Sequence, residues 1–449
     1  MNSDRSANAA KWSSSRGFLL ATIGSAIGLG NIWRFSYLAG ENGGGAFILI
    51  YLLAIVLIGL PVMLAEFALG RAGGADPTSA YPRISRRRAS TMIGWLAVIA
   101  CCVTLAYYAV VSGWVARYLF VALTTGFADP PAGGHGAAFA AFTADTVSPI
   151  FAQGLVMVAT AAVVAAGVNA GIERLCKILM PALAVIIVGL AAYSLTLPGS
   201  GRGIAFMFLP DWSALMRPQV YLAALGQAFF SLGVGYGAML TYGAYAGADQ
   251  SLTRNALLAA AADTIFALIA GVAVFGAVFA FDLDPASGPS LAFITLPEVF
   301  GRMSGGALFA VAFFALLLAA ALTSAVGLLE VPVVALIERT GASRRRAAWL
   351  LAGLIFLLGV PTSLGFGEMK AVTVAGMGLL ETFDTVVGEI LLPLSVLAVS
   401  VFVGWFWTMA QSTKTAGLGM WLGRAWFGLL RYAVPLVILT LFAAGIMRL

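Results

Sequence analysis

The chain has few charged residues for its length. Asp, Glu, Lys and Arg make up 10% of its 449 residues, while hydrophobic residues make up 61%. Soluble domains usually carry about 25% charged residues. The composition therefore excludes a soluble protein and predicts an integral membrane protein.

Residues that build common catalytic sites are also scarce. The one histidine, His135, falls in a Gly/Pro-rich connection, so a histidine metal site or a Ser-His-Asp triad cannot be assembled. No lysine follows a glycine, which excludes a P-loop. The three cysteines lie in or beside apolar segments, so we expect packing roles and no structural disulfide: Cys101, Cys102 and Cys176. The sequence predicts no enzyme, and transport must draw energy from an ion gradient or proceed without any energy source.

Apolar runs of a length that crosses a membrane recur along the whole chain. A hydrocarbon core of about 30 Å needs about 20 residues of helix. The leader from Met1 to Arg16 is too long and too mixed for a signal peptide, so the first span should stay in the membrane. We expect eleven helices near residues 18–38, 46–70, 92–125, 149–168, 175–197, 218–246, 256–281, 306–337, 347–363, 376–407 and 427–447.

Basic residues are distributed unevenly between the two sides that these spans define. With a cytoplasmic amino terminus, 18 of the 25 Lys and Arg residues fall inside, Arg86, Arg87 and Arg88 among them. The positive-inside rule thus predicts a cytoplasmic amino terminus and an external carboxyl terminus in the plasma (inner) membrane. The net charge of +6 follows from this topology, and we expect membrane lipid but no nucleic acid as a partner. No obligate protein partner is evident.

Two apolar segments are interrupted by glycine at corresponding places in the two halves of the chain. The interruptions are Gly24 to Asn31 and Ser231 to Gly237. Broken helices leave backbone polar groups unpaired, which lipid tolerates only where they line a cavity. Paired breaks therefore indicate the substrate site of a transporter. The alternative is that these glycines only allow close helix packing.

An odd number of spans separates the two breaks, so the halves have opposite topology. We predict an all-α, single transmembrane domain over 1–449, with inverted repeats at about 16–197 and 217–407 and a further helix at about 427–447. The site is expected between the repeats, at the bilayer midplane.

Several long motifs at and around these breaks resemble the neurotransmitter:sodium symporter family, particularly its bacterial amino-acid transporters. The motifs run in the family's order over nearly the whole chain, and they are Gly24 to Phe35, Glu41 to Phe47, Ala106 to Tyr108, Gly226 to Leu232, Phe293 to Pro297 and Leu322 to Ser324. The resemblance implies sodium-coupled symport of hydrophobic L-amino acids by alternating access.

The resemblance also implies two sodium sites. The first falls on the carbonyl of Ala26 and the side chains of Asn31, Ser231 and Asp263. The second falls on the carbonyls of Gly24, Ile27 and Ala320 and the hydroxyls of Thr323 and Ser324. These hydroxyls have an alternative use, because buried Ser and Thr often bond to carbonyls one turn back in their own helix.

Gly28 stands where monoamine carriers of the family place an aspartate, which implies an amino acid as substrate. Tyr108 and the amides near Leu29 and Gly30 would bind its carboxylate, although Tyr107 and Tyr108 could also be interfacial aromatics. The ammonium would face the carbonyls of Ala26 and Phe230 and the hydroxyl of Ser324. The implied substrate set also includes Ser231 and the side-chain pocket of Thr104, Phe230, Gly233, Tyr236 and Leu328.

Gly233 stands where many relatives have serine, so a bulky or aromatic side chain should fit. The hydroxyl of Thr104 would favour some polarity, as in tyrosine.

The resemblance further implies gates. Arg34 and Asp384 match the outer pair, and Trp12 and Glu338 match inner positions. Position 9, where the family usually has arginine, is Ala9, so Arg5 or Lys11 must serve. Glu66 and Glu389 are interpreted as structural hydrogen-bonding groups.

Chloride-dependent relatives hold an anion where this chain has Tyr51, Gln227 and Ser231. Some chloride-independent relatives have a glutamate where this chain has Ala267. Asp263 replaces the family's neutral asparagine and should supply the negative charge, so chloride is not expected. Its alternative partner is a helix terminus or Arg254. A non-transporting amino-acid sensor, or a symporter of another small zwitterion, remains an alternative function.

Overall fold

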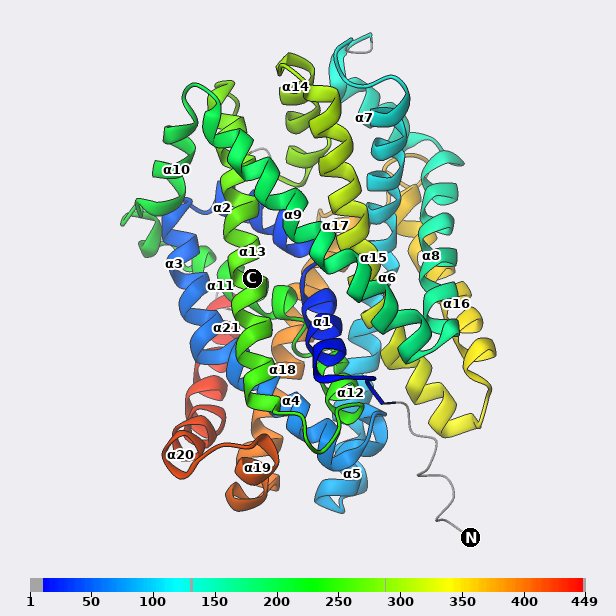
Figure 1. Ribbon diagram of the computed structural model, residues 1–449, viewed down its shortest axis with the longest axis vertical. Helices are drawn as coiled ribbons and strands as arrows, with labels where there is room; N and C mark the ends of the chain where they lie inside the picture. Colours follow the sequence, from blue (N-terminus) through cyan, green and yellow to red (C-terminus); the bar gives the residue numbers. More distant parts are fainter. Residues whose placement is uncertain (1–10, 130–131, 287, 447–449) are drawn as a thin grey trace.

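The computed structural model describes residues 11–129, 132–286 and 288–446. Over these ranges the chain forms a helical bundle, with two isolated bridges as its only β pairing (Figure 1). The helices α5 (Pro77–Ser85), α19 (Met409–Ala416) and α20 (Met420–Gly428) lie at the lower end of the bundle in Figure 1. The helices α7 (Gly134–Ala144), α10 (Ser200–Phe208) and α14 (Thr295–Arg302) lie at the upper end.

Within the described ranges, nine helices are long and apolar enough to cross a membrane without a sharp bend. These spans consist of α3 (Gly45–Ala54) to α4 (Leu60–Gly73), α6 (Thr91–Thr124), α8 (Ser148–Ala166), α9 (Arg174–Thr196), α13 (Leu252–Ala280), α15 (Gly306–Thr340), α16 (Arg344–Leu364), α17 (Leu379–Thr385) to α18 (Leu392–Val401), and α20 to α21 (Val434–Ile446).

Several of these spans include π-helical turns. They are η2 (Ile55–Gly59), η4 (Val168–Glu173), η7 (Val386–Leu391), η8 (Phe402–Phe406) and η9 (Leu429–Ala433).

Two further segments are interrupted, as the glycine pattern predicts. In the first, α1 (Ser15–Ala26) is followed by η1 (Gly30–Arg34) and α2 (Phe35–Glu41), with a bend of 50°. In the second, α11 (Pro218–Leu232) and α12 (Ala238–Ala244) are separated by five residues. With the first of these, the described residues hold up to ten candidate spans, whereas eleven are predicted; α11 and α12 lie where the sequence predicts the remaining span, near 218–246.

The interrupted segments occupy the interior of the bundle. The helix α1 packs on α9, α13 and α15, and Figure 1 shows it between α13 and α15. The long helices α6 and α15 pack against each other, and α11 packs on α3. Helix–helix packing therefore surrounds both breaks with protein, which is the condition for irregular backbone at membrane depth.

The connection that holds His135 is more ordered than its Gly/Pro content predicts. His135 is the second residue of α7, is 6% exposed and packs on the ring of Phe127. Its Nε2 lies 4.0 Å from a carboxylate oxygen of Glu298. The apolar residues after His135, Phe139 included, favour this short helix because they pack on the aromatic rings beneath it.

Candidate functional site

The break in the first span is held open by side chains from distant helices. The amide of Gly28 donates to Oδ1 of Asn31 at 3.0 Å, and the amide of Leu29 donates to the hydroxyl of Tyr108 at 3.1 Å. The hydroxyl of Ser324 donates to the carbonyls of Ser25 and Ile27 at 3.2 and 3.3 Å. Buried backbone groups need such partners, and here α6 and α15 supply them.

The break in the second span depends on glycine conformation. Gly233, Gly235 and Gly237 all have positive φ, at 64°, 87° and 71°, which other residues adopt at a cost. Glu66 accepts from the amide of Gly235 at 2.7 Å, and Ser395 donates to its carbonyl at 2.5 Å. The carboxylate of Glu66 thus satisfies the unwound backbone, in keeping with its predicted role.

The three side chains predicted for the first sodium site meet beside these breaks. Nδ2 of Asn31 donates to Ser231 Oγ at 2.9 Å and to Asp263 Oδ1 at 2.7 Å. Ser231 donates in turn to Asp263 Oδ2 at 2.6 Å. All three are at most 1% exposed. Arg254 forms no ion pair with Asp263, because the carboxylate is turned into this cluster instead.

The groups predicted for the second sodium site are partly brought together. Ser324 reaches the carbonyl of Ile27, as described above. The hydroxyl of Thr323 donates to the carbonyls of Ala319 and Ala320 at 3.3 and 3.0 Å, which is the one-turn-back bonding that the alternative interpretation predicts. At Gly24, an added Cβ would lie 2.7 Å from the sulfur of Cys176, so this glycine also permits close packing on α9. No ring of three or more His, Cys, Asp or Glu side chains exists in the described residues, so any cation here would be held by neutral oxygens and one carboxylate.

A small enclosed pocket lies between the two breaks. Nine predicted substrate residues line it: Ala26, Gly30, Thr104, Tyr108, Phe230, Gly233, Tyr236, Ser324 and Leu328. Leu29 and Ser231 do not; Leu29 contributes its amide to Tyr108, and Ser231 faces Asp263. Ser25, Gly28 and Ala238 line the pocket in addition. Ser25 and Ala238 directly follow Gly24 and Gly237, so their position in the sequence could have predicted that they line the pocket.

The wall of this pocket leaves no room for a side chain at Gly28. A Cβ there would lie 2.4 Å from Ser324 Oγ and 2.9 Å from the hydroxyl of Tyr108. Two buried hydroxyls in the pocket, Thr104 Oγ1 and Tyr236 OH, have no hydrogen bond of normal geometry to a described residue. The two hydroxyls face each other, so a polar atom that enters the pocket would meet both together.

Gly233 is predicted from the sequence to enlarge the pocket, and the structure shows that this glycine is also needed for the backbone of the break. A Cβ at this position would lie 3.2 Å from the terminal methyl of Met239, and the positive φ already disfavours a side chain. Substitution at Gly233 would therefore disturb the backbone of the break as well as the pocket.

The predicted outer gate is assembled above the pocket. Nε of Arg34 lies 3.5 Å from Asp384, and the guanidinium sits 5.1 Å from the ring centroid of Phe230. Tyr107 is buried and donates to Asp384 at 2.9 Å, so it contacts this predicted pair and is not an interfacial aromatic. Gln227 joins the pair by accepting from Arg34 at 3.1 Å. Sequence reasoning assigned no gate role to Tyr107, although its neighbour Tyr108 was assigned to the site.

Above this gate is a wide vestibule of about 680 Å³, and Arg34, Asp384 and Glu389 are in its wall. Glu389 is exposed, and its carboxylate makes no hydrogen bond to another described residue. Its predicted structural role is therefore wrong, because η7 turns the side chain toward the open vestibule.

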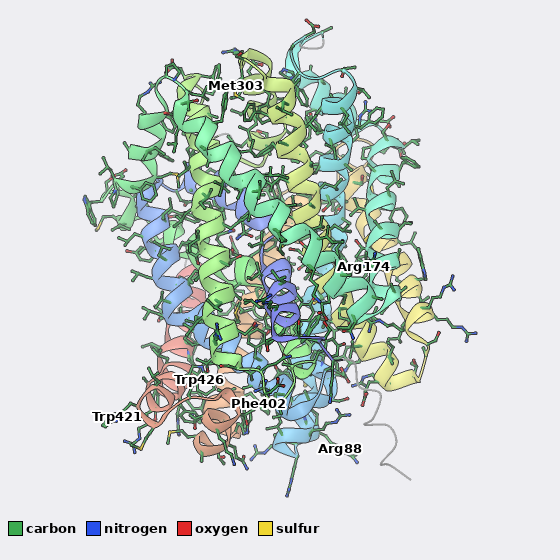
Figure 2. All side chains as sticks on the ribbon, in the orientation of Figure 1. Arg88, Arg174, Met303, Phe402, Trp421 and Trp426 are labelled. Atoms are coloured by element: carbon green, nitrogen blue, oxygen red, sulfur yellow. The ribbon has the colours of Figure 1, made fainter. Side chains whose placement is uncertain are left out.

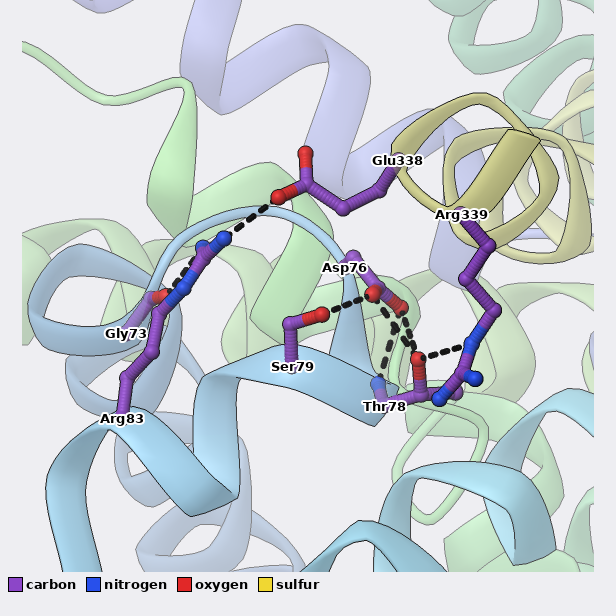
Figure 3. A network of polar contacts seen from close by, with 7 residues as sticks. All are labelled: Gly73, Asp76, Thr78, Ser79, Arg83, Glu338 and Arg339. Carbon is purple, nitrogen blue, oxygen red and sulfur yellow. Dashed lines mark hydrogen bonds and ion pairs between the residues drawn. The ribbon is translucent and has the colours of Figure 1, made fainter. Parts of the chain in front are cut away.

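The inner side differs from the predicted gate. Trp12 is buried and donates through Nε1 to the carbonyl of Tyr242 at 3.0 Å, but it is not joined to Glu338. Glu338 pairs with Arg83 of α5, which also donates to the carbonyl of Gly73 at 3.0 Å (Figure 3).

Within the described residues, neither Arg5 nor Lys11 is seen in place of the arginine that the family usually has at position 9. Lys11 forms no ion pair among the described residues, and Arg5 and Ala9 lie outside them. The inner carboxylate is thus held by the loop helix between the second and third spans. Sequence reasoning missed Arg83 because the pairing depends on how α5 folds back on α15.

The neighbours of Arg83 form a second network at this end. Asp76 caps α5 by accepting from the amide of Thr78 at 2.8 Å, and it also accepts from Ser79 at 2.6 Å. Nε of Arg339 donates to the hydroxyl of Thr78 at 3.1 Å, as Figure 3 shows. The first turn of α5 is therefore fixed to the end of α15 beside the Arg83–Glu338 pair.

Comparisons with known proteins agree with this architecture. The profile of the sodium:neurotransmitter symporter family matches residues 9–129 and 149–449. An uncharacterized sodium-dependent transporter, YhdH, from Bacillus subtilis (strain 168) is 37% identical over 96% of both chains. A second, from Haemophilus influenzae, is 33% identical over 97% of this chain and 98% of its own.

Among solved structures, the crystal structure of MhsT in complex with L-phenylalanine is similar over 97% of this chain and 99% of its own. Its TM-score is 0.93 and its sequence identity is 45%. The family profile and these relatives agree with the family resemblance that the motifs in the sequence predict. The chain belongs to the sodium:neurotransmitter symporter family and is a sodium-dependent membrane transporter, not an enzyme.

Proposed function

We propose that the protein imports a hydrophobic L-amino acid, of bulky or aromatic side chain, together with sodium. The observation that carries this proposal is the enclosed pocket between two helix breaks, with the Asn31–Ser231–Asp263 cluster directly beside it. A zwitterion needs a donor-rich end and an acceptor-rich end. Broken helices offer both, because their free amides and free carbonyls face the same cavity.

The carboxylate of the substrate would bind near Tyr108 and Gly30. The hydroxyl of Tyr108 accepts from the Leu29 amide, which leaves its hydrogen free to donate to an incoming carboxylate. The absence of room for a Cβ at Gly28 argues against a fixed side-chain carboxylate at this position, so the substrate must bring its own. The ammonium would face the carbonyl of Ala26 and the hydroxyl of Ser324, both in the pocket wall.

The side chain of the substrate would lie among Phe230, Tyr236 and Leu328, and Thr104 lines the same pocket. Apolar lining favours a hydrophobic group, and the facing hydroxyls of Thr104 and Tyr236 favour one polar atom within it. MhsT, the similar transporter, was crystallised with L-phenylalanine, which supports an aromatic substrate here. Tyrosine has both the aromatic ring that the apolar lining favours and the polar atom that the hydroxyls favour.

The conformation described is closed around this pocket. Its volume is about 30 Å³, against about 680 Å³ for the vestibule. The vestibule above it is far larger and ends at Arg34 and Asp384. Substrate entry would require these gate residues to separate, which supports transport by alternating access.

Sodium would be cargo at two places. The oxygens of Asn31, Ser231 and Asp263 are close enough to share one ion at the first, once the Asn31 amide turns its oxygen toward the cluster. Hard alkali cations favour such all-oxygen shells. The second would use Ser324, Thr323 and the carbonyl of Ile27.

Chloride is not required in this proposal. Asp263 lies within the cluster that includes Ser231, whose hydroxyl is 3.3 Å from that of Tyr51. Gln227 is turned away, donating to the carbonyl of Gly30 at 2.8 Å. A fixed carboxylate therefore stands where an anion would otherwise balance the sodium charge. Ala267, one turn further along α13, offers no charge.

The orientation in the plasma membrane follows from charge. The lower end of the bundle holds α5 (Figure 1) and Arg88 (Figure 2), next to Arg86 and Arg87 in the sequence, so we propose that this end faces the cytoplasm. The same charge bias favours a cytoplasmic amino terminus. An odd number of spans then puts the carboxyl terminus outside.

Uptake by proteoliposomes of the purified protein tests this function. Labelled phenylalanine, tyrosine and leucine should accumulate only with an inward sodium gradient, and a competition screen with all twenty amino acids should rank aromatic residues first. Saturable binding without accumulation would instead favour the amino-acid sensor. Accumulation of a zwitterion that no amino acid inhibits would favour the other symporter.

A further inference from the structure

A second pocket, remote from the transport site, opens at the lower end of the bundle. It has a volume of about 450 Å³ and lies where η8 passes into α19, against the start of η9. Its wall consists of Gly404, Trp405, Phe406, Trp407, Thr408, Met409, Phe427 and Arg431. The wall is thus largely aromatic, with one cationic side chain.

Arg431 is held in this wall without an anionic partner. Its Nε is buried and has no hydrogen-bond partner among the described residues. Its guanidinium lies 5.5 Å from the ring centroids of both Trp405 and Tyr432. The close approach of Arg431 depends on Gly404, where a Cβ would lie 2.8 Å from the Arg431 Cα. A buried cationic group needs an anion or hydrogen-bond acceptors to be stable, and the described protein supplies neither to Nε.

Of two further arginines at this end, Arg87 contacts the pocket wall and Arg424 does not. The guanidinium of Arg87 sits 4.9 Å from the ring centroid of Phe406, and that of Arg424 sits 5.8 Å from the ring centroid of Trp421. None of the ion pairs in the described residues involves Arg87, Arg424 or Arg431. The sequence explains why: residues 77–128 and 390–449 contain no Asp or Glu. The compensating anion must therefore come from outside the protein segments that build the pocket.

The surroundings are those of a membrane interface. Trp421 is 76% exposed and Trp405 is 48% exposed, and Met420 and Leu422 are exposed beside them. Figure 2 shows Trp421 projecting from the lower end of the bundle and Trp426 nearby. Trp426 fixes α20 by donating to the carbonyl of Pro61 at 2.9 Å. Tryptophan and arginine together are typical of the headgroup region, and basic pockets between spans on the cytoplasmic side bind anionic headgroups.

We propose that this pocket binds an anionic phospholipid of the inner leaflet. The headgroup phosphate would pair with Arg431, and Arg87, which stacks on Phe406 of the wall, would add a second positive charge. The first part of an acyl chain would lie against Trp405 and Phe406, both of which face lipid and line the pocket. The bound lipid would hold η8 and η9 together, at the lower ends of the tenth and eleventh spans.

Native mass spectrometry of the full-length protein in detergent, titrated with phosphatidylglycerol or phosphatidylcholine, tests the proposal. We expect preferential retention of phosphatidylglycerol. Arg431→Gln should weaken it about fivefold, the equivalent of the roughly 1 kcal/mol that one basic residue contributes at an anionic surface. Arg424→Gln is the matched control, since it removes the same charge from a neighbouring turn outside the pocket wall and should have little effect. Equal retention of the two lipids, or an equal loss in both variants, would overturn the proposal.

A second measurement does not depend on the folding of an arginine variant. Phosphatidylglycerol with brominated acyl chains should quench the fluorescence of the wild-type protein more than brominated phosphatidylcholine does. Trp405→Phe should remove most of that difference. Inorganic phosphate in millimolar excess should not displace the lipid; displacement would mean that the pocket binds free anions, and the lipid assignment would be wrong.

Discussion

Asn31 and Asp263 lie 232 residues apart in the chain, and their side chains are 2.7 Å apart in the structure. The contact joins the break of the first span to the middle of the seventh. Asn31 also holds the Gly28 amide at 3.0 Å, so one side chain links the backbone of the break to the carboxylate of Asp263. A change in charge at Asp263 should therefore alter the position of the Gly28 backbone in the pocket wall, and with it substrate binding.

Replacement of chloride by gluconate should leave sodium-driven uptake by the wild-type protein unchanged, because Asp263 supplies the negative charge next to the cation. Asp263→Asn keeps the shape and removes that charge. The variant should lose uptake, or regain it only when chloride is present. Uptake assays in the two salts at constant sodium measure this. A wild-type protein that stops transporting in gluconate would falsify the assignment of Asp263.

Asn31→Ala should raise the sodium concentration for half-maximal uptake about tenfold, equivalent to about 1.4 kcal/mol, because one oxygen ligand of a charged group is lost. The apparent affinity for substrate should also fall, since Asn31 supports Gly28 in the pocket wall. The control is Asn255→Ala, another buried asparagine, which bonds to Thr22 away from the site. An unchanged sodium dependence in Asn31→Ala would remove this residue from the first site.

Thr323→Ala decides between two uses of the same hydroxyl. As a sodium ligand, its loss should raise the sodium requirement with little change in substrate affinity. As a group that only bonds to its own helix, its loss should leave sodium dependence at the wild-type value. Thr362→Ala is the matched control, because Thr362 is buried and bonds one turn back in α16 at 2.7 Å.

Thr104→Val removes a hydroxyl from the pocket with almost no change in shape. Tyrosine should lose affinity by about fivefold relative to phenylalanine, as expected for one hydrogen bond of about 1 kcal/mol. Competition against labelled phenylalanine gives the ratio directly. Thr160→Val, a buried threonine of α8, should leave the ratio unchanged. An unaltered preference in Thr104→Val would show that the hydroxyl does not face the substrate.

Arg83→Gln should weaken closure on the inner side, because Glu338 loses its ion-pair partner. The expected result is a higher population of the inward-open state, measured as faster labelling of a cysteine placed at Ser25 in the pocket wall from the cytoplasmic side. Arg302→Gln removes a comparable exposed pair, with Glu298, from the opposite end and serves as control. Both single charge reversals, Arg83→Glu and Glu338→Arg, should behave like Arg83→Gln. The double reversal should restore slow labelling; if it does not, the pair has no gating role.

The sequence by itself determined the membrane location, most of the apolar spans and the two breaks. These depend on local properties: the length of an apolar run, and the placement of glycines that permit positive φ at Gly233, Gly235 and Gly237. The contact between Arg34 and Asp384 could be predicted as well, because the family resemblance pairs these two positions and Arg34 lies in one of the family's motifs.

Only the tertiary structure decided which side chains meet. The pairing of Glu338 with Arg83, the bond from Tyr107 to Asp384 and the exposure of Glu389 to the vestibule all depend on the rotation of one helix relative to another. Hydrophobic periodicity does not fix that rotation in these spans, because lipid-facing and protein-facing residues are both apolar. The partner of a polar residue is therefore set by the packing of distant helices and not by its neighbours in the sequence.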